Sequence, residues 1–133
     1  MPYFETAQTV EAYPARCEDR VTVLNSDERT VIVVADGAGG VGSGDLAAES
    51  VIREASAGYD TIQSAQGWDA RLKQMDRRIG VGESTAVIVD LRPQGICGSS
   101  VGDSQAWWRS PTFIPSRARA WSWSVCHPVN CAT

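Results

Sequence analysis

The sequence predicts an α+β domain, in which strands and helices are grouped along the chain rather than alternating. Two strand-like runs come first, two amphipathic helical segments follow, and a second group of strands completes the series. Such grouping favours separate layers of strands and helices over repeated βαβ units. The 133 residues, 43% hydrophobic and 21% charged, suit one globular domain.

The first two strands are predicted from apolar runs joined by turn-forming residues. Residues 21–24 (VTVL) lead into the turn cluster of residues 25–28 (NSDE), and residues 30–35 (TVIVVA) follow. The second run is almost continuously apolar and rich in β-branched residues, which is typical of a strand buried on both faces. We therefore predict a hairpin whose second strand is fully enclosed.

Two helices are predicted after a glycine-rich loop that covers residues 36–44. The first begins near Asp45, whose charge complements the helix dipole, and the second covers roughly Ser64 to Ile79. Apolar residues recur at helical spacing in both. They are Ala48, Val51, Ile52 and Ala55 in the first helix, and Trp68, Leu72, Met75 and Ile79 in the second. We expect both stripes to face the core.

Strands resume at residues 84–91 (STAVIVDL), turn at residues 92–95 and return over residues 95–101, and a short strand is expected at residues 105–108. The composition then changes. From Ser104 to the last residue there is no Asp, Glu, Gly or Leu, although four of the five tryptophans lie there. With no periodicity identified beyond Arg109, we assign residues 1–109 to the domain and residues 110–133 to an irregular tail, disordered or out of reading frame.

Composition excludes several classes of function. The net charge is −4 and no basic run is present, which argues against a nucleic-acid or acidic-membrane partner. No apolar stretch approaches the roughly 20 residues of a transmembrane helix, and the N-terminus does not resemble a secretory signal. The four cysteines form no CxxC pair. We therefore expect a cytoplasmic protein without a disulfide framework.

Three acidic positions are the candidates for chemistry. Glu18 and Asp19 precede the first strand, Asp36 ends the most hydrophobic strand, and Asp103 lies in a later turn. A carboxylate at the end of a buried strand is costly unless its charge is compensated, and Mg²⁺ or Mn²⁺ compensates it well. Glycine at position 37 would let its carbonyl serve as a further ligand. The ordinary alternatives are a solvated pair for Glu18 and Asp19 and a turn cap for Asp103.

The glycine loop also fits a nucleotide-binding pattern, which must be weighed. Residues 37–42 match GxGxxG between a strand and a helix. However, Asp36 would repel a pyrophosphate, and residues 64–79 are helical where a Rossmann unit needs a strand. A Walker A loop is excluded because Asp45 and Leu46 stand where Lys and Ser or Thr are required. A dinucleotide-binding fragment remains a lesser alternative.

Four motifs in order resemble those of the metal-dependent protein serine/threonine phosphatases, the PPM or type 2C family. Residues 17–19 (CED) resemble the family's Asn-Glu-Asp, and residues 36–40 (DGAGG) with Gly44 and Asp45 resemble its metal-binding glycine loop and the helix start after it. Ser84 and Thr85 resemble its Gly-Ser/Thr-Thr segment, and residues 101–107 (VGDSQAW) resemble its Val-Gly-Asp-Ser-Arg-Ala-Tyr/Trp. The resemblance covers about residues 14–109.

The resemblance implies a fold and a reaction. The fold would be a type 2C phosphatase-like β-sandwich flanked by helices in α-β-β-α layers. Residues 1–109 would be its N-terminal part, so that the sandwich is incomplete, with open strand edges and an exposed inner face. The reaction would be hydrolysis of a phosphoserine or phosphothreonine protein substrate, with two or three Mg²⁺ or Mn²⁺ ions.

The resemblance also implies roles for individual residues. Asp36 would bridge the two main metals and act with Asp19 as the catalytic pair, while Asp103 would take part in a third, looser metal site. The full metal set would be Glu18, Asp19, Asp36, Gly37 and Asp103. Arg16 is the nearest candidate for the family's phosphate-binding arginine.

The second half of the family's metal site has no counterpart after Arg109. Its two further aspartates lie in Ser-Asp-Gly and Asp-Asn contexts, which do not occur there. Two divalent cations would then share too few carboxylates. We expect weak metal binding and little or no hydrolysis. A non-catalytic phosphatase-like module that binds a partner is the main alternative.

Overall fold

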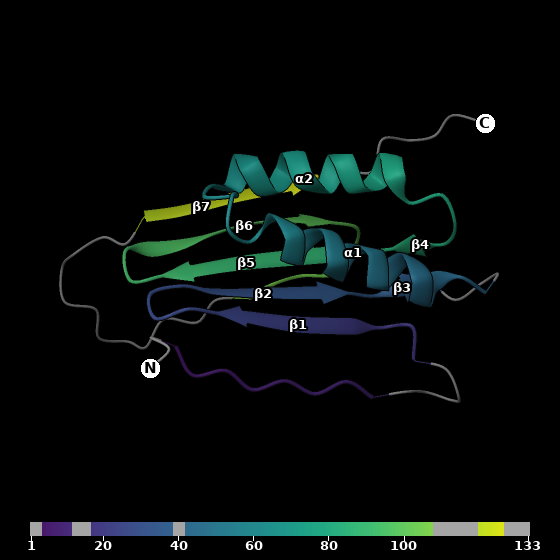
Figure 1. Cartoon of the computed structure of the whole chain (residues 1–133), viewed down its shortest axis with the longest axis horizontal. Coiled ribbons are helices and arrows are strands. Elements are labelled where there is room, and N and C mark those ends of the chain that lie inside the picture. The colour runs from purple at the N-terminus through teal and green to yellow at the C-terminus, as the bar shows by residue number, and fades with distance from the viewer. Residues whose placement is uncertain (1–3, 12–16, 39–41, 108–119, 127–133) are drawn as a thin grey trace.

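A computed structural model describes residues 4–11, 17–38, 42–107 and the backbone of 120–126. Figure 1 shows a sheet with two helices packed on one face, so the predicted α+β class is confirmed. The strand order is β1 (Arg20–Asn25), β2 (Thr30–Ala35), β5 (Ala86–Arg92), β6 (Gly95–Val101) and β7 (Ala120–Cys126). The helices are α1 (Gly44–Gly58) and α2 (Ala65–Arg78), and β3 (Gly37–Ala38) pairs with β4 (Glu83–Ser84). No helix in these ranges is long and apolar enough to cross a membrane.

Strands β1 and β2 form the predicted antiparallel hairpin, with Val21 opposite Val34. The expectation that β2 is buried on both faces is wrong. Val31 and Val33 are fully buried, whereas Val34 is 39% exposed. Side chains alternate between the two faces of a strand, and the helices cover only one face of this sheet. The opposite face of β2 is therefore open.

Both helices are confirmed: α1 begins one residue before its predicted start at Asp45, and α2 lies one residue inside its predicted bounds at each end. Helix α2 is capped by Ser64, whose side chain accepts a hydrogen bond of 3.0 Å from the Gly67 N–H. The predicted stripes form the core against the covered face of the sheet. Ala48, Val51 and Ala55 of α1 and Trp68, Leu72 and Met75 of α2 are buried, and Ile52 and Ile79 pack at its margin.

The end of the chain departs from the prediction in two ways. Strands β5 and β6 pair antiparallel as expected, but residues 105–107 form no strand and residue 108 lies outside the described residues. Residues 120–126 form β7, parallel to β6, so the assignment of an irregular tail is wrong at these residues. The sequence WSWSV at residues 121–125 alternates apolar and polar residues, which is a strand signal that the prediction missed. The other residues of the tail lie outside the description.

A buried carboxylate, Asp90 of β5, organises one end of the core. It accepts hydrogen bonds from Arg29 at 3.0 and 2.7 Å, from Arg92 at 3.2 and 3.0 Å, and from the Trp68 indole at 3.1 Å. Burial acts to raise the pKa of Asp90, but the hydrogen bonds from Arg29, Arg92 and Trp68 outweigh it and hold that pKa below its usual value. The Arg29 guanidinium also stacks 4.7 Å from the centre of the Tyr59 ring. The network is structural.

Candidate functional site

The sheet topology brings the three acidic segments together at one end of the strands. We call this end, which carries Glu18, Asp19, Asp36 and Asp103, the acidic edge. Arg20 pairs with Ala35, so Asp19, just before β1, lies beside Asp36, just after β2. Strand β5 begins beside the end of β2, and Ala86 of β5 pairs with Val101 of β6. Asp103, which follows β6, therefore emerges at the same edge.

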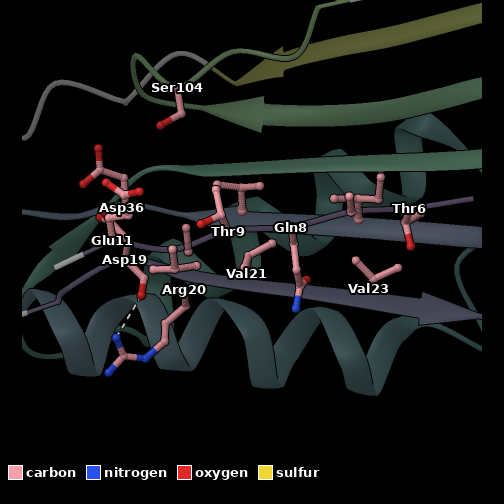
Figure 2. Close-up of a pocket in the computed structure, with 15 residues that line it drawn as sticks. Thr6, Gln8, Thr9, Glu11, Asp19, Arg20, Val21, Val23, Asp36 and Ser104 are labelled. Atoms are coloured by element: carbon pink, nitrogen blue, oxygen red, sulfur yellow. Dashed lines mark hydrogen bonds between the residues drawn. The ribbon is translucent and has the colours of Figure 1, made fainter.

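Asp36 is surrounded by other carboxylates. Its side chain is exposed and lies beside that of Asp19 at one end of a pocket (Figure 2). Partial desolvation, then the neighbouring Asp19 carboxyl and the charges of Asp103 and Glu18, raise the pKa of Asp36 above its ordinary value. Among the described residues, no Lys or Arg forms an ion pair with any of these four carboxylates. Within the described ranges, no ion pair therefore compensates the negative charge of this cluster.

The backbone of Asp36 is fixed by the segment that joins β4 and β5. The Thr85 N–H donates to the Asp36 carbonyl at 2.9 Å, and the Asp36 N–H donates to the Thr85 hydroxyl at 3.3 Å. The Ser84 hydroxyl donates to the same carbonyl at 3.2 Å, and the Thr85 hydroxyl is 2.6 Å from that of Ser104. Thr85 thus ties the glycine loop to the turn that carries Asp103. The sequence marked Ser84 and Thr85 only as part of a motif and gave no signal of this tie.

Gly37 is required by the close approach of three backbone segments. A Cβ at this position would lie 2.3 Å from the Gly44 carbonyl oxygen and 2.8 Å from the Glu18 carbonyl oxygen. Such distances are not tolerated between a side chain and fixed backbone. Glycine at position 37 therefore allows the start of α1 and the segment before β1 to converge beside Asp36.

A pocket of about 450 Å³ adjoins the acidic edge on the open face of the sheet. Its lining includes Glu11, Asp19 and Asp36, and Figure 2 shows these three side chains gathered at one end. Residues 6–11 form one wall and the valines of β1 and β2 contribute to the floor. No function was predicted for Glu11 or for residues 6–11, because this segment shows no periodic pattern.

The donor set fits a divalent cation in type but only partly in arrangement. Carboxylate oxygens are the ligands that Mg²⁺ and Mn²⁺ prefer. Asp19 and Asp36 lie side by side, whereas Glu18 and Asp103 act on Asp36 through their charges. Within the described part of the chain, no group of three or more His, Cys, Asp or Glu side chains is arranged to hold a metal ion. Arg16, the predicted phosphate ligand, lies outside the described residues.

A second pocket, of about 200 Å³, lies beside the Asp90 network and includes Arg92 and Cys97 in its lining. Burial, followed by the charge of Asp90, raises the pKa of the Cys97 thiol. A thiol is a nucleophile only as the thiolate. Cys97 is therefore poorly suited to nucleophilic catalysis at neutral pH.

Comparisons with protein-family models, with curated proteins and with solved structures find no match to this chain. The functional assignment therefore depends on the residues and their geometry.

Proposed function

We propose that the chain carries the N-terminal part of a metal-dependent protein serine/threonine phosphatase, with an incomplete type 2C-like sandwich. It would hold Mg²⁺ or Mn²⁺ at the acidic edge and recognise phosphoserine or phosphothreonine proteins. On their own, these 133 residues would bind metal weakly and hydrolyse phosphate esters slowly or not at all. The motif resemblance supplies the family, and the acidic edge supplies the chemistry.

One observation carries the proposal: strand pairing places Asp19 beside Asp36, and partial desolvation together with the Asp19, Asp103 and Glu18 carboxylates raises the pKa of Asp36. Clustered carboxylates without a cation are unfavourable, because each disfavours ionisation of the others. A divalent cation removes this repulsion. The antiparallel pairing of β2 with β5 also argues against the dinucleotide alternative, which needs parallel strands around its glycine loop.

Each part of the edge has a task under this proposal. Asp36 and Asp19 would hold the metal, with Glu18 and Asp103 adding charge at longer range. Thr85 would keep the Asp36 backbone in place through their paired hydrogen bonds. When bound, the ions would supply charge neutralisation for a phosphate ester and activation of water. No protein nucleophile is needed, which agrees with the raised pKa of Cys97.

Calorimetric titration with MnCl₂ tests the metal site. We expect weak binding to the unmodified chain, with Kd on the order of 10⁻⁴–10⁻³ M, the range of low-affinity oxygen-ligand sites. Asp36→Asn should abolish the binding heat. Asp76→Asn is the matched control, because Asp76 is an exposed aspartate on α2 and is not among the groups that shift the pKa of Asp36. Equal binding by all three proteins, or no binding at all, would overturn the metal assignment.

Hydrolysis of p-nitrophenyl phosphate is the companion assay. Manganese-dependent turnover should be slight, and EDTA should remove whatever is present. Vigorous turnover that is lost in Asp36→Asn would support the family but contradict the expectation of a weak enzyme.

The second candidate is a non-catalytic phosphatase-like module, which is favoured by the open pocket beside the acidic edge. A phosphopeptide that binds in the presence of Mn²⁺ without being hydrolysed would favour this module. Release of phosphate would favour the enzyme.

A further inference from the structure

The pocket on the open face of the sheet has the shape of a site for an extended chain. Residues 6–11 run beside β1 in Figure 1 and line the pocket on the open face of β1 and β2, where Figure 2 draws Thr6, Gln8 and Thr9 along its length. Six extended residues span about 20 Å. The wall therefore makes the pocket a groove along the strands, with the acidic edge at one end.

The floor of this groove is apolar and repeats every second residue. Val21 lies opposite Val34, and Val23 lies opposite Ile32, so the two pairs form successive rungs on the open face. Rungs two residues apart in a strand are separated by about 7 Å. The same spacing separates side chains i and i+2 of an extended peptide. A ligand with branched apolar side chains at alternate positions matches this floor.

The end of the groove is acidic. Glu11, Asp19 and Asp36 line it, and Glu11 is an exposed carboxylate outside the predicted metal set. Arg20 also lines the pocket, but its guanidinium donates to the backbone carbonyls of Cys17 and Asp19 at 2.9 Å each. Charge complementarity thus calls for a basic side chain at this end of the ligand.

We propose that the groove docks an extended peptide with branched apolar side chains at two alternate positions and a Lys or Arg that meets Glu11. That this peptide belongs to a substrate, with its phosphorylated residue beside the basic one, rests on the proposed function. A second copy of the chain fits less well, because the wall formed by residues 6–11 would obstruct a flat sheet.

Fluorescence anisotropy with an unphosphorylated labelled peptide in EDTA tests the groove independently of metal. The probe carries valine at two alternate positions and one terminal lysine. One control peptide has serine for both valines, and another has glutamate for the lysine. We expect the probe to bind at least fivefold more tightly than the serine peptide, which lacks the buried methyl groups of valine. We expect it to bind about two- to fivefold more tightly than the glutamate peptide, which lacks the ion pair.

Two variants locate the binding on the protein. Val34→Thr replaces a half-exposed floor residue without changing its shape and should weaken binding about fourfold. Glu11→Gln should weaken it about two- to fivefold, and about 0.5 M NaCl should erase this difference. Val81→Thr is the matched control, because Val81 is 61% exposed and does not line the pocket.

The outcomes separate the docking groove from the proposed function. Equal affinities for the valine and serine peptides, or equal effects of Val34→Thr and Val81→Thr, would overturn the groove. A concentration-dependent dimer in sedimentation would assign this face to a second copy, provided that Val34→Thr abolishes the dimer and the probe peptide does not compete with it. That result would also overturn the docking groove. If the probe binds but a phosphorylated version gains nothing from Mn²⁺, the groove is retained and the phosphatase assignment fails.

Discussion

Replacing Asp90 by asparagine tests how much the buried network contributes to stability. Asp90 is fully buried and accepts five hydrogen bonds from Arg29, Arg92 and Trp68. Asparagine keeps the shape but removes the charge and turns an NH₂ group toward guanidinium donors. The Arg29 side chain is only 11% exposed and would keep its charge without a counterion.

Removing one partner of a buried ion pair costs about 3–5 kcal/mol, because the other charge stays desolvated. Domains of this size have about 5–15 kcal/mol in total, so Asp90→Asn should remove a large share of the stability. Urea denaturation followed by tryptophan fluorescence measures the loss. Asp76→Asn, on the exposed face of α2, should change the free energy of unfolding by less than about 0.5 kcal/mol.

The pH dependence provides a second measurement. The pKa of Asp90 is lowered in the folded state, so the stability that its ionised form contributes is fully present above its unfolded pKa of about 3.9. This stability is lost as the pH falls through the folded-state pKa. Asp90→Asn should therefore show less acid destabilisation than the unmodified chain. If Asp90→Asn does not fold, Arg92→Gln provides a milder test, because the Arg92 side chain is 26% exposed. This variant should lower the free energy of unfolding by about 1 kcal/mol. A loss below about 0.5 kcal/mol in both variants would refute the reasoning.

Three further predictions concern the acidic edge. The pKa of Asp36 is raised in the folded state, so its ionisation costs stability above that pKa but not below the unfolded pKa of about 3.9. Asp36→Asn should therefore stabilise the metal-free protein by about 0.5 kcal/mol at pH 7 and have no effect at pH 3, as measured by urea denaturation. Gly37→Ala should cost about 1–3 kcal/mol in the same assay, whereas Gly80→Ala should be tolerated, because a Cβ at Gly80 meets no atom within 4 Å. Thr85→Val should cost about 1 kcal/mol and weaken Mn²⁺ binding in calorimetry, and Ser104→Ala, which removes one of these contacts, should cost less.

The parts of the fold that depend on local pattern could be predicted from the sequence. The hairpin and both helices follow from periodicity and turn residues that act over a few positions. The open face of β2 could not be predicted, because an apolar run does not reveal which face the helices will cover. The link between Arg29 and Asp90 also escaped prediction, since the two residues are 61 positions apart and neither lies in a motif. Strand β7 was missed although residues 121–125 alternate, because its pairing partner is a distant parallel strand.

The candidate site also has residues that the sequence could predict and residues that it could not. The acidic pattern and then the motif resemblance selected Glu18, Asp19, Asp36 and Asp103, and the sheet topology brings their segments together. Nothing in the sequence tied Glu11 to that edge, because only tertiary structure lays residues 6–11 over the sheet. Arg16, outside the described residues, stays a prediction.

Asp90 and Asp36 show how the surroundings of a carboxylate decide its pKa. Asp90, on β5, is fully buried, yet two arginines and an indole hold its pKa below the usual value. Asp36, which follows β2, is exposed, yet partial desolvation, then the neighbouring Asp19 carboxyl and the charges of Asp103 and Glu18, raise its pKa. Burial alone would raise the pKa of Asp90 more than that of Asp36, so the arginines and the indole account for the reversal. Under the proposed function, a divalent cation would supply at Asp36 the positive charge that two arginines supply at Asp90.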